Sequence, residues 1–327
     1  MKNTIKSALD IVCDLSGPHR FSASKTPKLW VLMYHRVLPA TDPRYASEEP
    51  GMVVTPETFD MHLSEIKKFF EVVALDEWMT KLEQGAYLPR KACAITFDDG
   101  WRDNYQYATP LLEKHQLPAT IFIVQNKIGT TFNFWPNKVA EQLLAQSNSL
   151  KSHPLFAQAI GELAYPLNRE CIAQIIEKLK EHSDAEIYEA LQTVSDQQRE
   201  IRSLMNWEEV KALNNNELFS IQSHTNNHFR LDNSLSEETL LNEIVHSKRE
   251  IENQLKTEVR HFCYPNGDYS HAALMKVKSN YKAAVTTKHG INKASNLELH
   301  ELLRISIHED ATNSPLKFRG KLSGWRN

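Results

Sequence analysis

Two segments of the sequence carry side chains of the kind that bind metal ions and move protons. The stretch SHTNNH places His224 and His228 four residues apart, and AITFDDG places Asp98 and Asp99 directly after an apolar run. A catalytic divalent metal such as Zn²⁺ takes three protein ligands and keeps one position for water, whose pKa it lowers toward neutrality. Asp99, His224 and His228 can supply that ligand set, and Asp98 can take the water's proton as a general base.

Each of these pieces also has an ordinary structural explanation. An Asp-Asp-Gly turn lets Asp accept backbone N–H groups and Gly adopt a positive φ, and single residues such as His35 and His308 are more often satisfied polar groups than functional ones. The positions of these residues favour a functional site, because His and Asp residues of this kind follow five separate apolar runs. If the runs are parallel strands of a barrel, their ends meet at one mouth, where His308 could protonate a leaving group.

The composition is that of a folded globular protein. Hydrophobic residues make up 41% of the chain and charged residues 24%, so a packed core can form. Lys and Arg number 38 against 41 Asp and Glu, a balance that offers no electrostatic footprint for nucleic acid or an anionic membrane. The four cysteines form no CxxC motif and require no oxidising compartment.

The N-terminal segment reads neither as a signal peptide nor as a membrane-spanning helix. It begins basic, but Asp10 and Asp14 interrupt its apolar part, and no run of 18 apolar residues occurs anywhere in the chain. We therefore expect a cytoplasmic protein without a transmembrane segment. A short amphipathic anchor at the start, peripheral to the inner membrane, is the alternative.

Short apolar runs alternate with amphipathic helical stretches along most of the chain. Strands are predicted at 29–37, 71–75, 92–97, 119–124, 218–223, 260–264, 281–287 and 302–307. Helices are predicted after Thr55, which Pro56 follows, at Asn206 with Glu209 as its capping-box partner, and over about 236–256. This alternation argues for a parallel α/β barrel or a doubly wound sheet.

Residues 135–204 depart from the alternation, because their patterns are helical alone. We predict an N-terminal extension over 1–27 and a barrel over 28–327, with a helical insertion at about 135–204 inside a βα loop. The insertion either frames a substrate groove or mediates self-association.

The motifs resemble those of the polysaccharide deacetylases of the NodB-homology type, carbohydrate esterase family 4. Residues 96–100 match the family's first motif, TFDDG, and SHTNNH contains its second, H-[ST]-x-x-H. LMYHRV, VTPETFDMHL and LPATIFIV are similar to one bacterial branch, so the resemblance covers roughly 28–310 apart from the insertion. It implies a distorted (β/α)7–8 barrel that removes N-acetyl, sometimes O-acetyl, groups from sugars in a metal-dependent hydrolysis, with Zn²⁺ as the expected metal.

Carried over residue by residue, the resemblance gives Asp98 the role of base and makes Asp99, His224 and His228 the metal ligands. The family's fifth motif, L-x-H, occurs in the loosened form Ile-Ser-Ile-His and makes His308 the acid. The fourth motif, Asp-x-x-Asp-Trp, has no convincing match. These departures concern the leaving-group side of the reaction, and the motifs of the metal site are complete.

The third family motif is also altered. It usually reads R-P-P-Y-G, whereas CYPNG keeps only a proline and the glycine and puts Cys263 in place of the arginine that tunes the base. Arg304 or Arg102 could substitute for that arginine. The backbone N–H of Asn266 stands where the family places an oxyanion donor, a role that is indifferent to the side chain.

Three functions remain open at this point. The first is removal of acetyl groups from N-acetylated sugar units of a polysaccharide or of a lipid- or nucleotide-linked precursor. The second is hydrolysis of another C–N or ester bond on the same fold, and the third is a catalytically silent sugar-binding relative, against which the intact Asp98 argues. The expected partner is a carbohydrate, and the sequence does not define the oligomeric state. Four aromatic residues either stack on sugar faces or pack the insertion onto the barrel, with packing favoured: Trp101, Phe132, Phe134 and Trp135.

Overall fold

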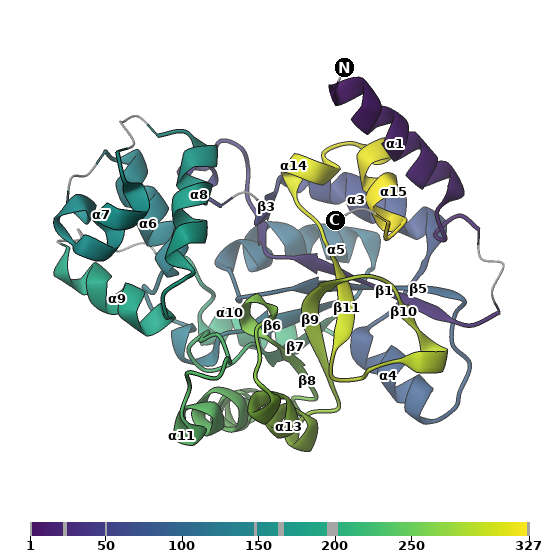
Figure 1. Ribbon diagram of the computed structural model, residues 1–327. Helices are drawn as coiled ribbons and strands as arrows, with labels where there is room; N and C mark the ends of the chain where they lie inside the picture. Colours follow the sequence, from purple (N-terminus) through teal and green to yellow (C-terminus); the bar gives the residue numbers. More distant parts are fainter. Residues whose placement is uncertain are drawn as a thin grey trace.

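In a computed structural model of the protein, seven parallel strands form a closed barrel (Figure 1). The structure describes residues 2–21, 25–49, 51–146, 149–162, 167–194 and 202–325. The strands are β1 (Lys28–Tyr34), β5 (Lys91–Phe97), β6 (Ala119–Ile123), β7 (Phe219–Ser223), β8 (His261–Cys263), β9 (Ala283–His289) and β11 (Leu302–Ser306). They follow one another in the order β1, β11, β9, β8, β7, β6 and β5, and β5 pairs back with β1. The predicted barrel is therefore confirmed with seven strands, and the doubly wound sheet is excluded.

Four short strands lie outside the ring: β2 (Arg36–Val37), β3 (Val53–Val54), β4 (Glu71–Val72) and β10 (Asn292–Lys293). The predicted strand at 71–75 is only partly formed. It stops at Val72 because Leu75 begins helix α4 (Leu75–Glu83), which buries Leu75, Trp78 and Met79 on one face. The predicted strand at 29–37 is interrupted at His35, between β1 and β2.

The helices of the barrel cover the outside of the strands. They are α2 (Pro43–Ser47), α3 (Pro56–Phe69), α4, α5 (Thr109–His115), α10 (Trp207–Asn214), α11 (Glu237–Leu241), α12 (Ser247–Leu255), α13 (His271–Asn280), α14 (Glu309–Thr312) and α15 (Pro315–Leu322). Two predicted starts are confirmed: Thr55 caps α3, and Asn206 and Glu209 form a capping box on α10. The helix predicted over 236–256 is present, but a π-helical turn, η4 (Asn242–His246), joins its two halves.

Between β6 and β7 the chain forms a lobe of four helices, which lies to the left in Figure 1. These are α6 (Trp135–Leu144), α7 (Pro154–Ile160), α8 (Arg169–Leu179) and α9 (Asp184–Thr193). The helices pack around an apolar cluster of their own that includes Val139, Leu143, Ile175 and Leu179. The lobe thus has a core separate from that of the barrel.

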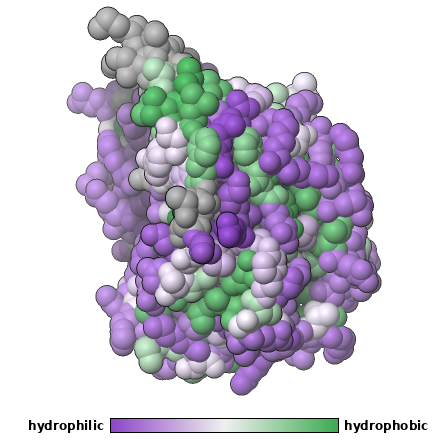
Figure 2. Space-filling view, turned by 90° about the vertical axis from the view of Figure 1, so that its right-hand side faces the viewer, coloured by the Kyte–Doolittle hydropathy of each residue, from purple (hydrophilic) through white to green (hydrophobic). Residues whose placement is uncertain are grey.

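An N-terminal helix, α1 (Lys2–Ser16), packs against α15 at the side of the barrel away from the lobe (Figure 1). Figure 2 looks onto this side and shows hydrophobic side chains gathered at the top of the molecule, where α1 lies. In the described part of the chain, no helix combines the length and the apolar character needed to cross a membrane.

One titratable group lies deep in the packing between α3 and α15. His62 stacks on Phe318 with ring centroids 4.0 Å apart, and its Nε2 lies 2.8 Å from the carbonyl oxygen of Thr312. Its Nδ1 lies 3.2 Å from the hydroxyl of Tyr34. Burial lowers the pKa of His62 to about 3, so the folded protein holds this imidazole neutral.

We predict that His62 makes the protein less stable in mild acid. Below about pH 6.5 the unfolded chain takes up a proton that the folded chain refuses, and the resulting loss reaches about 2 kcal/mol at pH 5. Urea unfolding of the wild type and of His62→Gln at pH 7 and pH 5 measures how much His62 lowers the free energy of unfolding in acid. The variant should lose about 2 kcal/mol less than the wild type between the two pH values, and equal losses would contradict the prediction.

Candidate active site

The ends of β5 and β7 bring the acidic pair and the histidine pair together. Asp98 and Asp99 directly follow β5, His224 directly follows β7, and His228 lies in the loop beyond it. The Nε2 atoms of His224 and His228 lie 3.3 Å and 3.4 Å from the same oxygen, Oδ1 of Asp99. One potential ligand atom from each of the three side chains lies within 4.8 Å of the other two.

The two loops that carry these residues have unusual backbone conformations. Asp99, Thr225 and His228 have φ values of 76°, 68° and 66°, in the left-handed region that costs a non-glycine residue about 1–3 kcal/mol. Two side-chain contacts hold the second loop: the Thr225 hydroxyl accepts a hydrogen bond from the backbone of His228 at 2.8 Å, and Glu243 accepts from the backbone of Asn227 at 2.8 Å. Glu243 belongs to the π turn η4, so this irregular turn supports the histidine loop.

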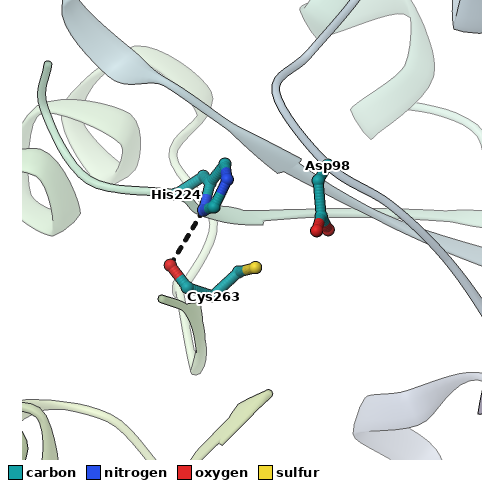
Figure 3. A group of neighbouring side chains, drawn as sticks. All are labelled: Asp98, His224 and Cys263. Atoms are coloured by element: carbon teal, nitrogen blue, oxygen red, sulfur yellow. Dashed lines mark hydrogen bonds between the residues drawn. The ribbon is translucent and has the colours of Figure 1, made fainter. Parts of the chain in front are cut away.

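Partners outside the cluster orient its side chains. The Trp101 indole donates to Oδ2 of Asp99 at 2.8 Å, which leaves Oδ1 toward the histidines. The Nδ1 of His224 lies 2.8 Å from the carbonyl oxygen of Cys263, which fixes Nδ1 as the protonated nitrogen and leaves Nε2 free to bind a metal (Figure 3). Two imidazole nitrogens and one carboxylate oxygen, oriented in this way, fit a catalytic divalent cation.

Asp98 has a different partner. Arg304 on β11, whose side chain is buried, donates to both of its carboxylate oxygens at 2.8 Å and 2.7 Å. Burial alone would raise the pKa of Asp98, but the charge and hydrogen bonds of Arg304 outweigh burial and hold this pKa below its usual value. Arg102, the other arginine named from the sequence, pairs with Glu209 instead.

A second group of potential ligands, Asp98, His224 and Cys263, is also compact (Figure 3). It suits a metal less well for two reasons. Both oxygens of Asp98 already bind Arg304. Burial also raises the pKa of the Cys263 thiol well above its usual value, so the thiolate that a metal requires is disfavoured.

The remaining predicted residues occupy different places. Asn266, with a φ of 54°, lines a cleft of about 520 Å³ together with Asp98 and Asp99. His308 is not among the described residues that line this cleft, and its Nδ1 lies 3.7 Å from Asp310. His35 does line the cleft, and its Nε2 lies 3.8 Å from Oδ2 of Asp98. Burial lowers the pKa of both imidazoles.

The cleft lies between the barrel mouth and the helical lobe, which provides Trp135, Glu177, Asp184 and Tyr188. The aromatic residues near the start of the lobe mainly pack. Trp101 and Phe134 are buried, with centroids 5.1 Å apart, and Phe134 lies edge-on to His228. These contacts agree with the packing interpretation, while Trp101, Phe134 and Trp135 also line the cleft, and Phe134 lies against a candidate metal-binding imidazole.

The fold is a seven-stranded parallel barrel, and an aspartate and two histidines at the carboxyl ends of its strands form a candidate metal centre. The family model described as polysaccharide deacetylase matches residues 86–284. The chain belongs to the polysaccharide deacetylase family.

Two curated relatives match part of the chain. "Putative polysaccharide deacetylase YxkH" of Bacillus subtilis is 31% identical over 133 residues, which cover 40% of this chain and 44% of the relative. Poly-beta-1,6-N-acetyl-D-glucosamine N-deacetylase of Staphylococcus epidermidis is 33% identical over 79 residues, 24% of this chain and 27% of the relative. The matched regions thus span less than half the length of these relatives.

Solved structures share the fold over nearly the whole chain. The Streptococcus pyogenes deacetylase PplD, solved in complex with acetate, aligns with a TM-score of 0.59 at 22% identity, over 90% of this chain and 97% of that one. IcaB from Ammonifex degensii aligns with the same TM-score at 17% identity and the same coverage. At these identities the likeness concerns the fold alone.

We predict that Arg304 positions Asp98 and keeps it ionised. Arg304→Met should lower kcat/KM by about two orders of magnitude, the effect of a misplaced reacting group. It should also move the acidic limb of the pH–rate profile upward, because the pKa of Asp98 is no longer held down. Arg304→Lys should restore part of the activity and return the limb toward its wild-type position. An unshifted limb in Arg304→Met, with the fold confirmed by circular dichroism, would rule out this role.

Proposed function

We propose that the chain is a metal-dependent hydrolase that removes acetyl groups from N-acetylated sugar units of a polysaccharide or of its biosynthetic precursor. The observation that carries the proposal is the cluster of Asp99, His224 and His228, with Asp98 beside it at the wall of an open cleft. The Staphylococcus relative, named for a poly-N-acetylglucosamine, supports a sugar amide as the substrate. The acetate in the Streptococcus structure matches the product of such a hydrolysis.

We propose Zn²⁺ as the cofactor, held by Asp99, His224 and His228. When bound, a divalent cation at these residues would polarise the acetyl carbonyl and make a water molecule more acidic. The donor set supports this assignment, because histidine and carboxylate ligands without a thiolate are typical of catalytic rather than structural zinc sites.

The protein's own residues account for the proton transfers. Asp98, kept ionised by Arg304, accepts the proton of the attacking water, and the new C–O bond turns the carbonyl oxygen into an oxyanion. The backbone N–H of Asn266 is the proposed donor to this oxyanion. A protonated imidazole then gives its proton to the amide nitrogen, the C–N bond breaks, and acetate and a free amino sugar leave.

Two imidazoles compete for the last step. The family resemblance assigns it to His308, whereas His35 lies on the cleft and nearer to Asp98. Since a proton donor must reach the leaving nitrogen, the lining position supports His35, and the motif supports His308.

We also propose that residues 135–204 act as an insertion that frames the substrate groove. The lobe's Lys180 and Asp184 line the cleft opposite the barrel, and Asp184 holds Arg230 of the histidine loop through a 3.3 Å ion pair. Polar side chains on the two sides of a cleft suit the hydroxyl and amide groups of a sugar chain.

We predict that metal binding and turnover separate in two variants. In an acetate-release assay on N-acetylglucosamine oligomers, Asp98→Asn should keep its metal and lose about 10²–10⁴-fold in kcat, the usual contribution of a general base. His228→Ala should lose both metal and activity, and His271→Ala, which changes an exposed histidine on α13, should lose neither. Hydrolysis by Asp98→Asn at the wild-type rate would refute the base assignment. Absence of acetate release by the metal-loaded wild type would refute the function.

We predict that the proton donor is revealed by a matched pair of variants, His35→Asn and His308→Asn. Loss of the donor should abolish the basic limb of the pH–rate profile and lower the rate least on an acetyl ester with a phenolic leaving group, which departs without protonation. The histidine whose variant shows both effects is the donor. A similar loss on amide and phenolic ester for both variants would exclude both histidines.

A further inference from the structure

The N-terminal helix α1 has its polar and apolar sides reversed relative to an ordinary surface helix. Its buried side is Asp10, Cys13 and Asp14, which recur at the spacing of one helical face, and the buried Gly17 follows directly after the helix. Its exposed side is apolar: Leu9, Ile11, Val12 and Leu15 are 46%, 46%, 56% and 57% exposed. A helix in contact with water alone normally buries its apolar face.

The buried acidic residues attach the helix to the protein. Arg20 donates to Asp14 at 2.8 Å, and Arg319 of α15 donates to it at 2.9 Å. Asp10 lies over Gly320, where a Cβ atom would come within 3.1 Å of its carboxylate. Burial alone would raise the pKa of Asp14, but the two arginines outweigh burial and lower it to about 2. The ion pair with Arg319 therefore links the helix to α15, and the pair with Arg20 lies within the N-terminal segment itself, while the hydrophobic side of the helix faces outward.

Within this segment, the described residues place no exposed carboxylate beside the apolar side. Among residues 8–21, whose side chains the structure describes, the acidic ones are Asp10 and Asp14, and both are turned inward. Lys2 and Lys6 belong to the first turns of the helix, and Lys25 is exposed shortly after its end. An apolar stripe without exposed carboxylates, in a segment whose sequence also carries Lys2, Lys6 and Lys25, complements a surface with anionic headgroups over hydrocarbon.

We propose that α1 is an interfacial helix that docks the protein on an anionic lipid surface, with Leu9, Ile11, Val12 and Leu15 in the headgroup region. A second copy of the chain is a poorer occupant, because a stable dimer buries about 800 Å² per subunit, more than four half-exposed side chains provide. A bilayer accepts a single helix face. The cleft stays accessible in this arrangement, because α1 and the helical lobe lie on opposite sides of the barrel (Figure 1).

Vesicle co-sedimentation of the full chain tests the proposal. The wild type should sediment with vesicles that contain phosphatidylglycerol, bind pure phosphatidylcholine less, and bind less as salt is raised. The double variant Val12→Asp/Leu15→Asp should bind at least about tenfold more weakly, because it places charges in the buried stripe. Met275→Asp, which changes a 49% exposed residue on α13, is the matched control and should bind as the wild type does.

Three results would overturn the proposal. In the first, the wild type stays in the supernatant with both kinds of vesicle. In the second, the double variant binds vesicles as tightly as the wild type. In the third, the wild type is a dimer that does not bind vesicles, and the double variant is a monomer. Circular dichroism and the melting temperature check the fold, and Ile11→Ser/Leu15→Ser repeats the test if the charged variant unfolds. Acetate release from a soluble oligomer is measured in parallel, so that loss of docking is distinguished from loss of the active site.

Discussion

The parallel closure of the barrel is the constraint on which the candidate site depends. Because β5, β6 and β7 run side by side in one direction, the residues that follow β5 and β7 emerge at the same rim. Asp99 and His224 meet there although the whole helical lobe lies between β6 and β7. Five residue pairs between β6 and β7 close that long connection. The entropic cost of closing a loop grows only slowly with its length, so the long insertion adds little to this cost. A one-residue slip in this register would turn the side chains at the rim to the other face.

The same rim separates two adjacent carboxylates into different chemical environments. Asp98 faces a guanidinium, which stays protonated at any working pH and supports a carboxylate that accepts protons. Asp99, turned by its positive φ, faces two imidazoles, which can release their protons to bind a metal. Neighbouring positions at a strand end thus have surroundings that suit the proposed base and the proposed metal ligand, as in other pairs of carboxyl groups with divergent environments.

The sequence was informative where the structure depends on local pattern. Apolar runs and the caps at Thr55 and Asn206 were enough to predict parallel strands alternating with helices, and the family resemblance then favoured the barrel over a doubly wound sheet. Polar residues at the strand ends predicted the convergence of Asp99 with His224. Contacts between distant strands were not predictable in the same way. Arg304 was one of two candidates, because its pairing with Asp98 depends on where β11 closes the ring. The relation of His35 and His308 to the cleft depends on loop paths that no periodicity encodes.

The N-terminal helix shows how the structure changes the reading of two residues in the sequence. Asp10 and Asp14 interrupt the apolar pattern, and in the sequence they argue against a signal peptide or a membrane-spanning helix. In the structure those same carboxylates point inward, and Asp14 binds two arginines of the protein. Removing the acidic residues from the outer surface leaves an unbroken apolar stripe, because positions 10, 13, 14 and 17 share one face and positions 8, 11, 12 and 15 share the other. The acidic residues that interrupt the apolar pattern in the sequence are thus those whose burial leaves the apolar side of the helix exposed.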